Sequence, residues 1–171
     1  MPSPFVEKRA VRLTVVERLM RRGSVDAAVV AINNLFATSG IRAVSTEDVN
    51  AVFERFRVAG MDRRARNVER FYRDYLIFCF ADRRLSDEEL ADLEHLREIL
   101  CLDADTVDAI HRNVARQVYL RSVSEVLADG AIDAREREFL AALRDQLGVP
   151  ELIAENIREM KERQYRSRHR G

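Results

Sequence analysis

The residues with the clearest chemical potential are carboxylates gathered in one short loop. Residues 128–136 read Ala-Asp-Gly-Ala-Ile-Asp-Ala-Arg-Glu and include Asp129, Asp133 and Glu136. Several carboxylates on one loop can bind a hard divalent cation such as calcium, magnesium or manganese. The spacing departs from the calcium loop of helix-loop-helix proteins, which requires a bidentate glutamate at its twelfth position. A weak divalent-metal site is therefore one hypothesis for this loop.

Helix capping is the structural explanation of the same acidic residues. An N-cap at Asp133 would accept a hydrogen bond from a free backbone amide, and Glu136 would complete a capping box. Such a cap stabilises a helix start by about 1 kcal/mol. Asp129 would close the turn of the preceding helix at Gly130. We favour capping for this loop and keep metal binding as the alternative.

The capping pattern occurs three times in the chain. Each copy has an apolar residue, then an N-cap residue, then an acidic residue three positions after the cap. The caps and their acidic partners are Ser45 with Asp48, Ser86 with Glu89, and Asp133 with Glu136. The helix ends expected fifteen residues after these caps are Gly60, Cys101 and Gly148. Shared caps and a shared length predict helix-turn-helix units that stack on one another.

The second and third copies match each other most closely. Asp82 and Glu89 lie 47 positions before Asp129 and Glu136, respectively. The first copy has Gly-Ile at residues 40–41 where the other two have Ala-Asp. A site built from the acidic loop residue would therefore involve only the second and third copies.

Apolar residues recur at helical spacing along nearly the whole chain, and no convincing alternating strand is present. The region 103–128 is expected to form one long helix or two helices that meet near Gln117. The other expected helices cover residues 4–21, 24–36, 45–60, 62–80, 86–100, 133–147 and 150–165. The apolar residues expected in the core of the three copies are Val49, Val52, Phe56, Leu90, Leu93, Leu96, Leu100, Phe139, Leu140, Leu143 and Leu147.

These patterns predict an all-α protein of about seven to nine helices, arranged as a single domain of stacked helix-turn-helix units. The domain would cover residues 1–171. Within it we expect an N-terminal helical pair at 1–40, three related units at 41–157, and a basic helix end and tail at 158–171.

A stripe of arginines follows one face of the expected helix at 62–80. Arg63, Arg66, Arg70 and Arg73 fall at i, i+3, i+7 and i+10, and the next helix is acidic. Salt bridges across a helical hairpin are one explanation, and each exposed pair of this kind contributes little stability. The other explanation is a docking surface for an acidic partner or for phosphate groups.

The last twelve residues, 160–171, are rich in basic side chains. A solvated chain end is the simpler explanation. Binding to nucleic acid or to another anionic surface is the alternative. Sequence-specific RNA recognition is not expected, because the segment has no aromatic platform beyond Tyr165.

Composition narrows the functional classes further. The chain has 29 basic and 29 acidic residues, a balance that does not favour a nucleic-acid-coating protein. The apolar run at 75–81 is far shorter than the roughly 20 residues of a membrane-spanning helix. Cys79 and Cys101 show no metal-ligand spacing, and the N-terminus has no apolar signal core. These features predict a cytoplasmic protein, with peripheral membrane attachment as an alternative.

No catalytic group of residues is evident. His95, His111 and His169 are scattered and lack paired metal-ligand spacing. Glycine-rich phosphate loops are absent. We therefore expect a protein that is not an enzyme and that has no organic cofactor.

The loop at 128–136, followed by Phe139-Leu140 and by Leu147-Gly148-Val149, resembles the TerB-like family, which is named for tellurite-resistance proteins. The resemblance covers about residues 71–157 and is compatible with the whole chain. The same loop pattern is also similar, more weakly, to the helical stromal part of the chloroplast inner-envelope import scaffold.

The TerB-like resemblance implies an all-helical domain whose acidic loops hold a divalent metal. By position, Asp129 and Glu136 would be ligands, together with Asp82 and Glu89 of the other matched copy. Arg-Arg at residues 83–84 replaces the Gly-Ala of the last loop. Two adjacent arginines disfavour a cation, so the departure weakens the Asp82 half of such a site.

The resemblance also implies a non-catalytic protein-interaction module, acting in bacterial stress response or in a membrane-associated assembly. A protein partner is expected, and self-association is compatible with this role. The alternatives are a metal sensor that uses the loop from Asp129 to Glu136, and a binder of nucleic acid or anionic surfaces.

Overall fold

The computed structural model describes residues 3–9, 25–58, 61–80 and 85–168, with the side chains of residues 61–64 and 129 excepted. Within these ranges every regular element is helical, as predicted. The elements are α2 (Val25–Ser39), the 3-10 turn η1 (Ile41–Ala43), α3 (Thr46–Arg55), α4 (Met61–Cys79), α5 (Asp87–Ile99), α6 (Ala104–Val126), the 3-10 turn η3 (Leu127–Asp129), α7 (Ala134–Leu147) and α8 (Glu151–Arg168).

The chain divides into two compact units, Met1–Val107 and Asp108–Gly171. The first unit contains α2 to α5, and the second contains most of α6 together with α7 and α8. The finer subdivision at 1–40, 41–157 and 158–171 stays a prediction.

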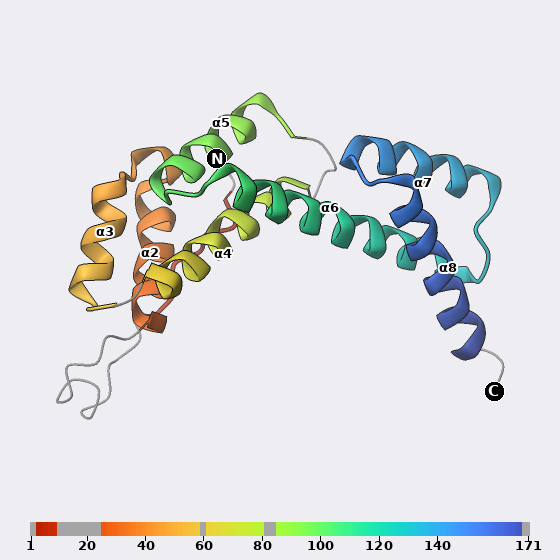
Figure 1. The fold of residues 1–171 in the computed structure, drawn as a ribbon, viewed down its shortest axis with the longest axis horizontal. Coiled ribbons are helices and arrows are strands. Elements are labelled where there is room, and N and C mark those ends of the chain that lie inside the picture. The colour runs from red at the N-terminus through yellow and green to blue at the C-terminus, as the bar shows by residue number, and fades with distance from the viewer. Residues whose placement is uncertain (1–2, 10–24, 59–60, 81–84, 169–171) are drawn as a thin grey trace. The chain divides into compact units, whose positions relative to one another are not determined.

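An aromatic cluster forms the centre of the first unit. The rings of Phe5 and Phe36 lie 4.9 Å apart, and those of Phe36 and Phe71 lie 5.6 Å apart. Phe5 also stacks on Tyr75 at 6.2 Å. Helix α2 packs against α3 and α4, and α4 packs against α5, as can be followed in Figure 1. The cluster therefore joins the N-terminal segment to α2 and α4 through buried rings.

The N-terminal segment differs from the prediction. A helix from residue 4 was expected, but residues 3–9 have no regular secondary structure, and the rest of that helix lies outside the described residues. Asn33 donates its side-chain amide to the carbonyl of Val6 at 2.7 Å. Asn34 donates to the carbonyl of Lys8 and accepts from its amide. The backbone groups that a helix would pair internally are thus bound by two side chains of α2.

All three predicted capping boxes are confirmed. In each one the cap side chain accepts from the third amide of the helix, and the acidic side chain accepts from the cap amide. Thr46, Asp87 and Ala134 are consequently the first residues of α3, α5 and α7. The sequence pattern of a cap residue and an acidic residue three positions later predicted these three helix starts, because capping is a local interaction.

The three helices also end alike, in a residue of left-handed conformation followed by a buried apolar residue. The left-handed residues are Arg57 (φ 51°), Cys101 (φ 52°) and Gly148 (φ 63°). The buried residues that follow are Val58, Leu102 and Val149. Each donates its amide to a carbonyl five residues earlier. This closure satisfies carbonyl groups at the end of each helix.

The first copy is shorter than predicted. Its helix α3 ends at Arg55, and the left-handed residue that follows it is Arg57, whereas the predicted end, Gly60, lies outside the described residues. The amide of Val58 bonds to the carbonyl of Phe53 at 3.0 Å and anchors the turn there. A glycine is therefore not required where an apolar anchor fixes the end.

Two predicted core residues are exposed. Leu90 is 48% exposed and Phe139 is 36% exposed, whereas Leu93, Leu96, Leu140 and Leu143 are buried. Helices α5 and α7 bury a narrow stripe, so apolar positions beside that stripe face outward.

The second unit has its own apolar core, formed by α6, α7 and α8. Region 104–126 is one continuous helix without a break at Gln117. The largest fully buried side chains of this unit are Tyr119, Val114, Val123 and Leu140. None of the described helices is long and apolar enough to span a membrane.

Candidate interaction surfaces

The acidic loop of the third copy is a tight turn with a defined backbone. Gly130 adopts φ 107° and donates its amide to the carbonyl of Leu127 at 3.2 Å. The Glu136 side chain accepts from the Asp133 amide at 2.7 Å, and Asp133 accepts from the Glu136 amide at 2.8 Å. Both carboxylates therefore serve the start of α7.

The residues proposed for metal binding fall into two groups. Glu89 is engaged with Ser86 in the box of α5, just as Asp133 and Glu136 are engaged in that of α7. Asp82 and the side chain of Asp129 lie outside the described residues. Among the residues that are described, no group of three or more His, Cys, Asp or Glu could hold a metal ion. A metal at these positions stays a prediction.

Tyr165 of α8 lies directly over the turn. A Cβ atom on Gly130 would come within 2.8 Å of the Tyr165 hydroxyl oxygen. Helix α8 also packs against η3. The left-handed backbone requires the glycine, and any larger residue would also displace the tyrosine ring from the turn.

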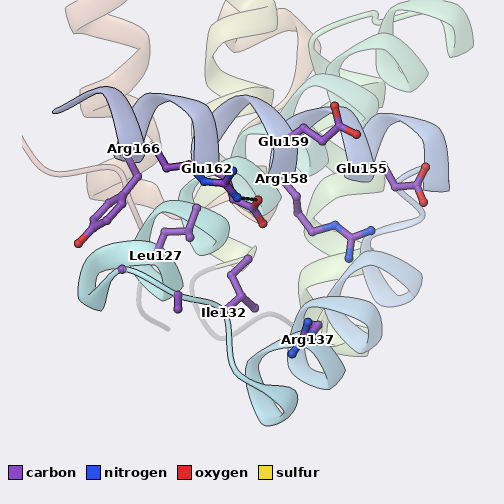
Figure 2. A pocket seen from close by; sticks show the side chains of 11 residues that line it. Leu127, Ile132, Arg137, Glu155, Arg158, Glu159, Glu162 and Arg166 are labelled. Carbon is purple, nitrogen blue, oxygen red and sulfur yellow. Dashed lines mark hydrogen bonds and ion pairs between the residues drawn. The ribbon is translucent and has the colours of Figure 1, made fainter. Parts of the chain in front are cut away.

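A cleft of about 540 Å³ lies beside this contact, between the turn and α8. Leu127 and Ile132 supply apolar lining on the turn side, and Arg137 of α7 also lines it. Glu155, Arg158, Glu159, Glu162 and Arg166 line the α8 side, at spacings that place them on one helix face. Figure 2 shows these α8 side chains across from Ile132.

Ion pairs neutralise part of the charge on α8. Glu162 pairs with Arg166 at 3.2 Å, and Glu159 pairs with Arg163 at 2.8 Å. In the described part of the chain, neither Arg137 nor Arg158 forms such an ion pair, and Glu155 is the lining glutamate without one. Three arginines and three glutamates line the cleft, and the pairing of Glu159 with Arg163, which lies outside the lining, leaves a small excess of positive charge.

A second hollow of about 220 Å³ adjoins the cleft in the same unit. Leu127 and Tyr165 line both hollows. Lys161 and Arg168 line the second one, and among the residues whose side chains are described no acidic one lines it. The two hollows therefore form one apolar and basic surface around Tyr165.

The arrangement of α7 and α8 that makes the cleft is held by Arg144. Its guanidinium pairs with Glu151 at 2.8 Å and with Asp145 at 2.6 Å. These contacts raise the pKa of Arg144 above its usual value, chiefly through the hydrogen bond to Asp145. Its carbonyl also accepts from the Val149 amide at 3.0 Å.

The arginine stripe is largely on the surface of α4. Arg66, Arg70 and Arg73 are exposed, and the side chain of Arg63 lies outside the described residues. Arg70 pairs with Asp74 of its own helix at 3.5 Å. The structure thus places three of the four arginines on an accessible face.

The basic C-terminal region is helical farther than predicted. Helix α8 continues to Arg168 instead of ending near Tyr165. The pairs that Glu159 and Glu162 form with arginines one turn later support this extension.

A polar network in the first unit was not predicted from the sequence. Asp92 is 7% exposed and accepts from the Tyr75 hydroxyl at 2.7 Å and from the Arg42 guanidinium. Arg42 also donates to the carbonyl of Glu88 at 3.0 Å. The network fastens η1 to α4 and α5. Its one sequence signal is an aspartate next to Leu93 in the apolar stripe of α5.

The residues of the α8 cleft were also missed. Their i, i+3, i+4 and i+7 spacing looks like an ordinary charged helix face. Only the turn at Gly130, which brings apolar residues opposite that face, makes it a cleft.

Comparison with known proteins adds a family to this architecture. The model of the Tic110 family, described as a chloroplast envelope transporter, matches residues 62–164. The chloroplastic Tic110 protein of Pisum sativum is 34% identical over 76 residues, which cover 44% of this chain and 8% of that protein. Its Arabidopsis thaliana counterpart is 32% identical over 76 residues, 44% of this chain and 7% of that protein. No solved structure matches the chain.

These matches correct two expectations. They agree with the weaker resemblance, to the chloroplast import scaffold, and give no support to the TerB-like family or to tellurite resistance. The predicted cytoplasmic location is wrong, because both relatives are chloroplastic. The pattern of an acidic loop followed by a capped helix is common to both resemblances, so it could not distinguish the TerB-like family from the import scaffold.

The family match runs from α4 through most of α8, and it includes both acidic-loop copies. It covers more than half of the chain. The chain belongs to the Tic110 family.

Proposed function

We propose that this chain is a non-catalytic protein-interaction module of a chloroplast envelope assembly. The observation that carries the proposal is the family match across residues 62–164, because the family is described as a chloroplast envelope transporter. The chain spans less than a tenth of its two relatives, so this role is that of one helical part.

The arginine stripe is the surface we assign to this role in the first unit. Arg66, Arg70 and Arg73 are exposed along one face of α4. Guanidinium groups bind carboxylates through paired hydrogen bonds, so a stripe of them suits an acidic protein surface. Electrostatic contacts of this kind chiefly accelerate association and select partners.

The test is localisation and co-isolation of the tagged full-length chain in its native host. We expect the wild-type chain in a plastid envelope fraction together with specific proteins. Arg66→Glu/Arg70→Glu should lose those proteins. Arg112→Glu/Arg116→Glu changes two exposed arginines of α6 at the same spacing and is the matched control. A chain found outside plastids, or without enriched proteins, would contradict the proposal.

A further inference from the structure

We propose that the cleft beside Tyr165 binds an acidic segment of a partner protein, with an apolar side chain between its acidic residues. This surface lies in the second unit and is separate from the arginine stripe of α4. This inference rests on the proposed function in one respect, namely that the binding partner is a protein.

The shape of the surface supports a segment of chain as the occupant. The main cleft has a volume of about 540 Å³ and the adjoining hollow one of about 220 Å³. Ligand clefts in proteins commonly have volumes of about 300–1,000 Å³. Leu127 and Tyr165 line both parts, so an apolar side chain placed on them would have its neighbours along the chain in the two hollows.

The charges specify the chemistry of those neighbours. Arg137 and Arg158 line the main cleft, and Lys161 and Arg168 line the adjoining hollow. Glu155 is the acidic lining residue that remains outside the ion pairs of Glu159 and Glu162 in the described part of the chain. Basic groups on both sides of an apolar centre complement acidic residues on both sides of an apolar one.

The turn at Gly130 keeps this surface in shape. The left-handed backbone and the Tyr165 contact hold η3 against α8, and Arg144 holds the beginning of α8 against α7. A preformed surface loses less conformational entropy when a segment binds. The geometry of the turn therefore has a binding role as well as a structural one in this proposal.

The test is fluorescence anisotropy of the full-length chain with a short labelled peptide that carries glutamates on both sides of a single leucine. We expect saturable binding that weakens as salt is added. Arg137→Glu/Arg158→Glu should weaken binding by about tenfold or more. Peptides with glutamine for glutamate, or serine for leucine, should each bind less tightly.

Matched variants separate a local effect from a general one. Arg135→Glu reverses one charge, half of the change in the double variant, at an exposed position of α7 that does not line the cleft, and it should bind like the wild type. Arg137→Gln/Arg158→Gln removes the charges without reversing them and should also weaken binding. Thermal melting checks that each variant is folded.

Three results would overturn the proposal. They are no saturable peptide binding, equal weakening by Arg135→Glu, and equal binding of the glutamate and glutamine peptides. Vesicles of phosphatidylcholine and phosphatidylglycerol are a further probe. Binding to these vesicles through Arg137 and Arg158, without peptide binding, would assign the surface to lipid headgroups instead. Peptide binding that survives Arg66→Glu/Arg70→Glu, while co-isolated proteins are lost, would separate this site from the stripe.

Discussion

Gly130 and Tyr165 are in contact such that a single added carbon atom would collide. A Cβ on Gly130 would lie 2.8 Å from the Tyr165 hydroxyl oxygen, and the backbone there has φ 107°. The turn and α8 are therefore coupled through a residue that has no side chain.

Replacement of Gly130 by alanine should lower the free energy of unfolding by about 1–3 kcal/mol, through strained backbone and collision together. In a Tyr165→Ala background the collision is absent and only the backbone cost remains. Urea denaturation of the wild type, Gly130→Ala, Tyr165→Ala and the double variant measures the coupling free energy between the two residues. If Gly130→Ala lowers the free energy of unfolding equally in both backgrounds, Tyr165 does not contribute to the cost of the substitution.

Left-handed helix ends give a second prediction. Cys101 has φ 52° and occupies the position that Gly148 occupies in the third copy. Cys101→Gly should therefore stabilise the chain by about 1 kcal/mol, since other residues pay that much for this conformation. Gly148→Ala should destabilise it by a similar amount. Denaturant midpoints measure both changes, and an unchanged Gly148→Ala variant would be inconsistent with a strained end.

The Asp92 network gives a third prediction. Asp92→Ala should cost about 1–3 kcal/mol, because the buried Tyr75 hydroxyl loses its acceptor. Tyr75→Phe should cost less, since Asp92 keeps its pair with Arg42. Burial first, and then the hydrogen bond to Asp92, raises the pKa of Tyr75 above its usual value. Burial also raises the pKa of Tyr119, so ultraviolet titration should show one fewer tyrosine that ionises only on unfolding in Tyr75→Phe than in the wild type.

Acid sensitivity of the helix starts is a fourth prediction. Hydrogen bonds from Ser45 lower the pKa of Asp48, and those from Thr106 lower the pKa of Asp103, below the usual 3.8. A lowered folded-state pKa stabilises the fold fully above the unfolded value, and this contribution is lost as pH falls through the folded value. Stability should thus decline below about pH 4. Asp103→Asn should flatten this decline in acid titrations followed by circular dichroism; an unaltered slope would argue against the assignment.

Metal addition tests the remaining hypothesis for the acidic loop. Capping alone predicts that millimolar calcium, magnesium or manganese leaves the melting temperature unchanged, because Asp133 and Glu136 already bind backbone amides. A metal-induced rise that disappears in Asp129→Asn would instead support the metal site. A rise that persists in that variant would place the metal elsewhere.

Local patterns predicted the fold well and the sites poorly. The starts of α3, α5 and α7 followed from three boxes, because a cap and its partner are three residues apart. The end of α3 did not follow, because the left-handed Arg57 and the buried Val58 fix it before the predicted end at residue 60.

The surfaces depend on contacts that no local pattern contains. Asp92 meets Arg42 across 50 residues, and the cleft needs α8 to lie against the turn at Gly130. The irregular N-terminal segment likewise depends on Asn33 and Asn34, which lie 27 and 26 residues from their partners Val6 and Lys8. Such pairs are decided by packing of elements that are distant in sequence.

The most direct measurement of the central claim is quantitative co-isolation of the full-length chain from its native host, compared across charge variants. The account predicts that the wild-type chain and the two controls, Arg112→Glu/Arg116→Glu and Arg135→Glu, recover the same envelope proteins. Arg66→Glu/Arg70→Glu and Arg137→Glu/Arg158→Glu should each recover less of at least one of them. Identical recovery by all five chains, or recovery of no envelope protein by the wild type, would contradict the account.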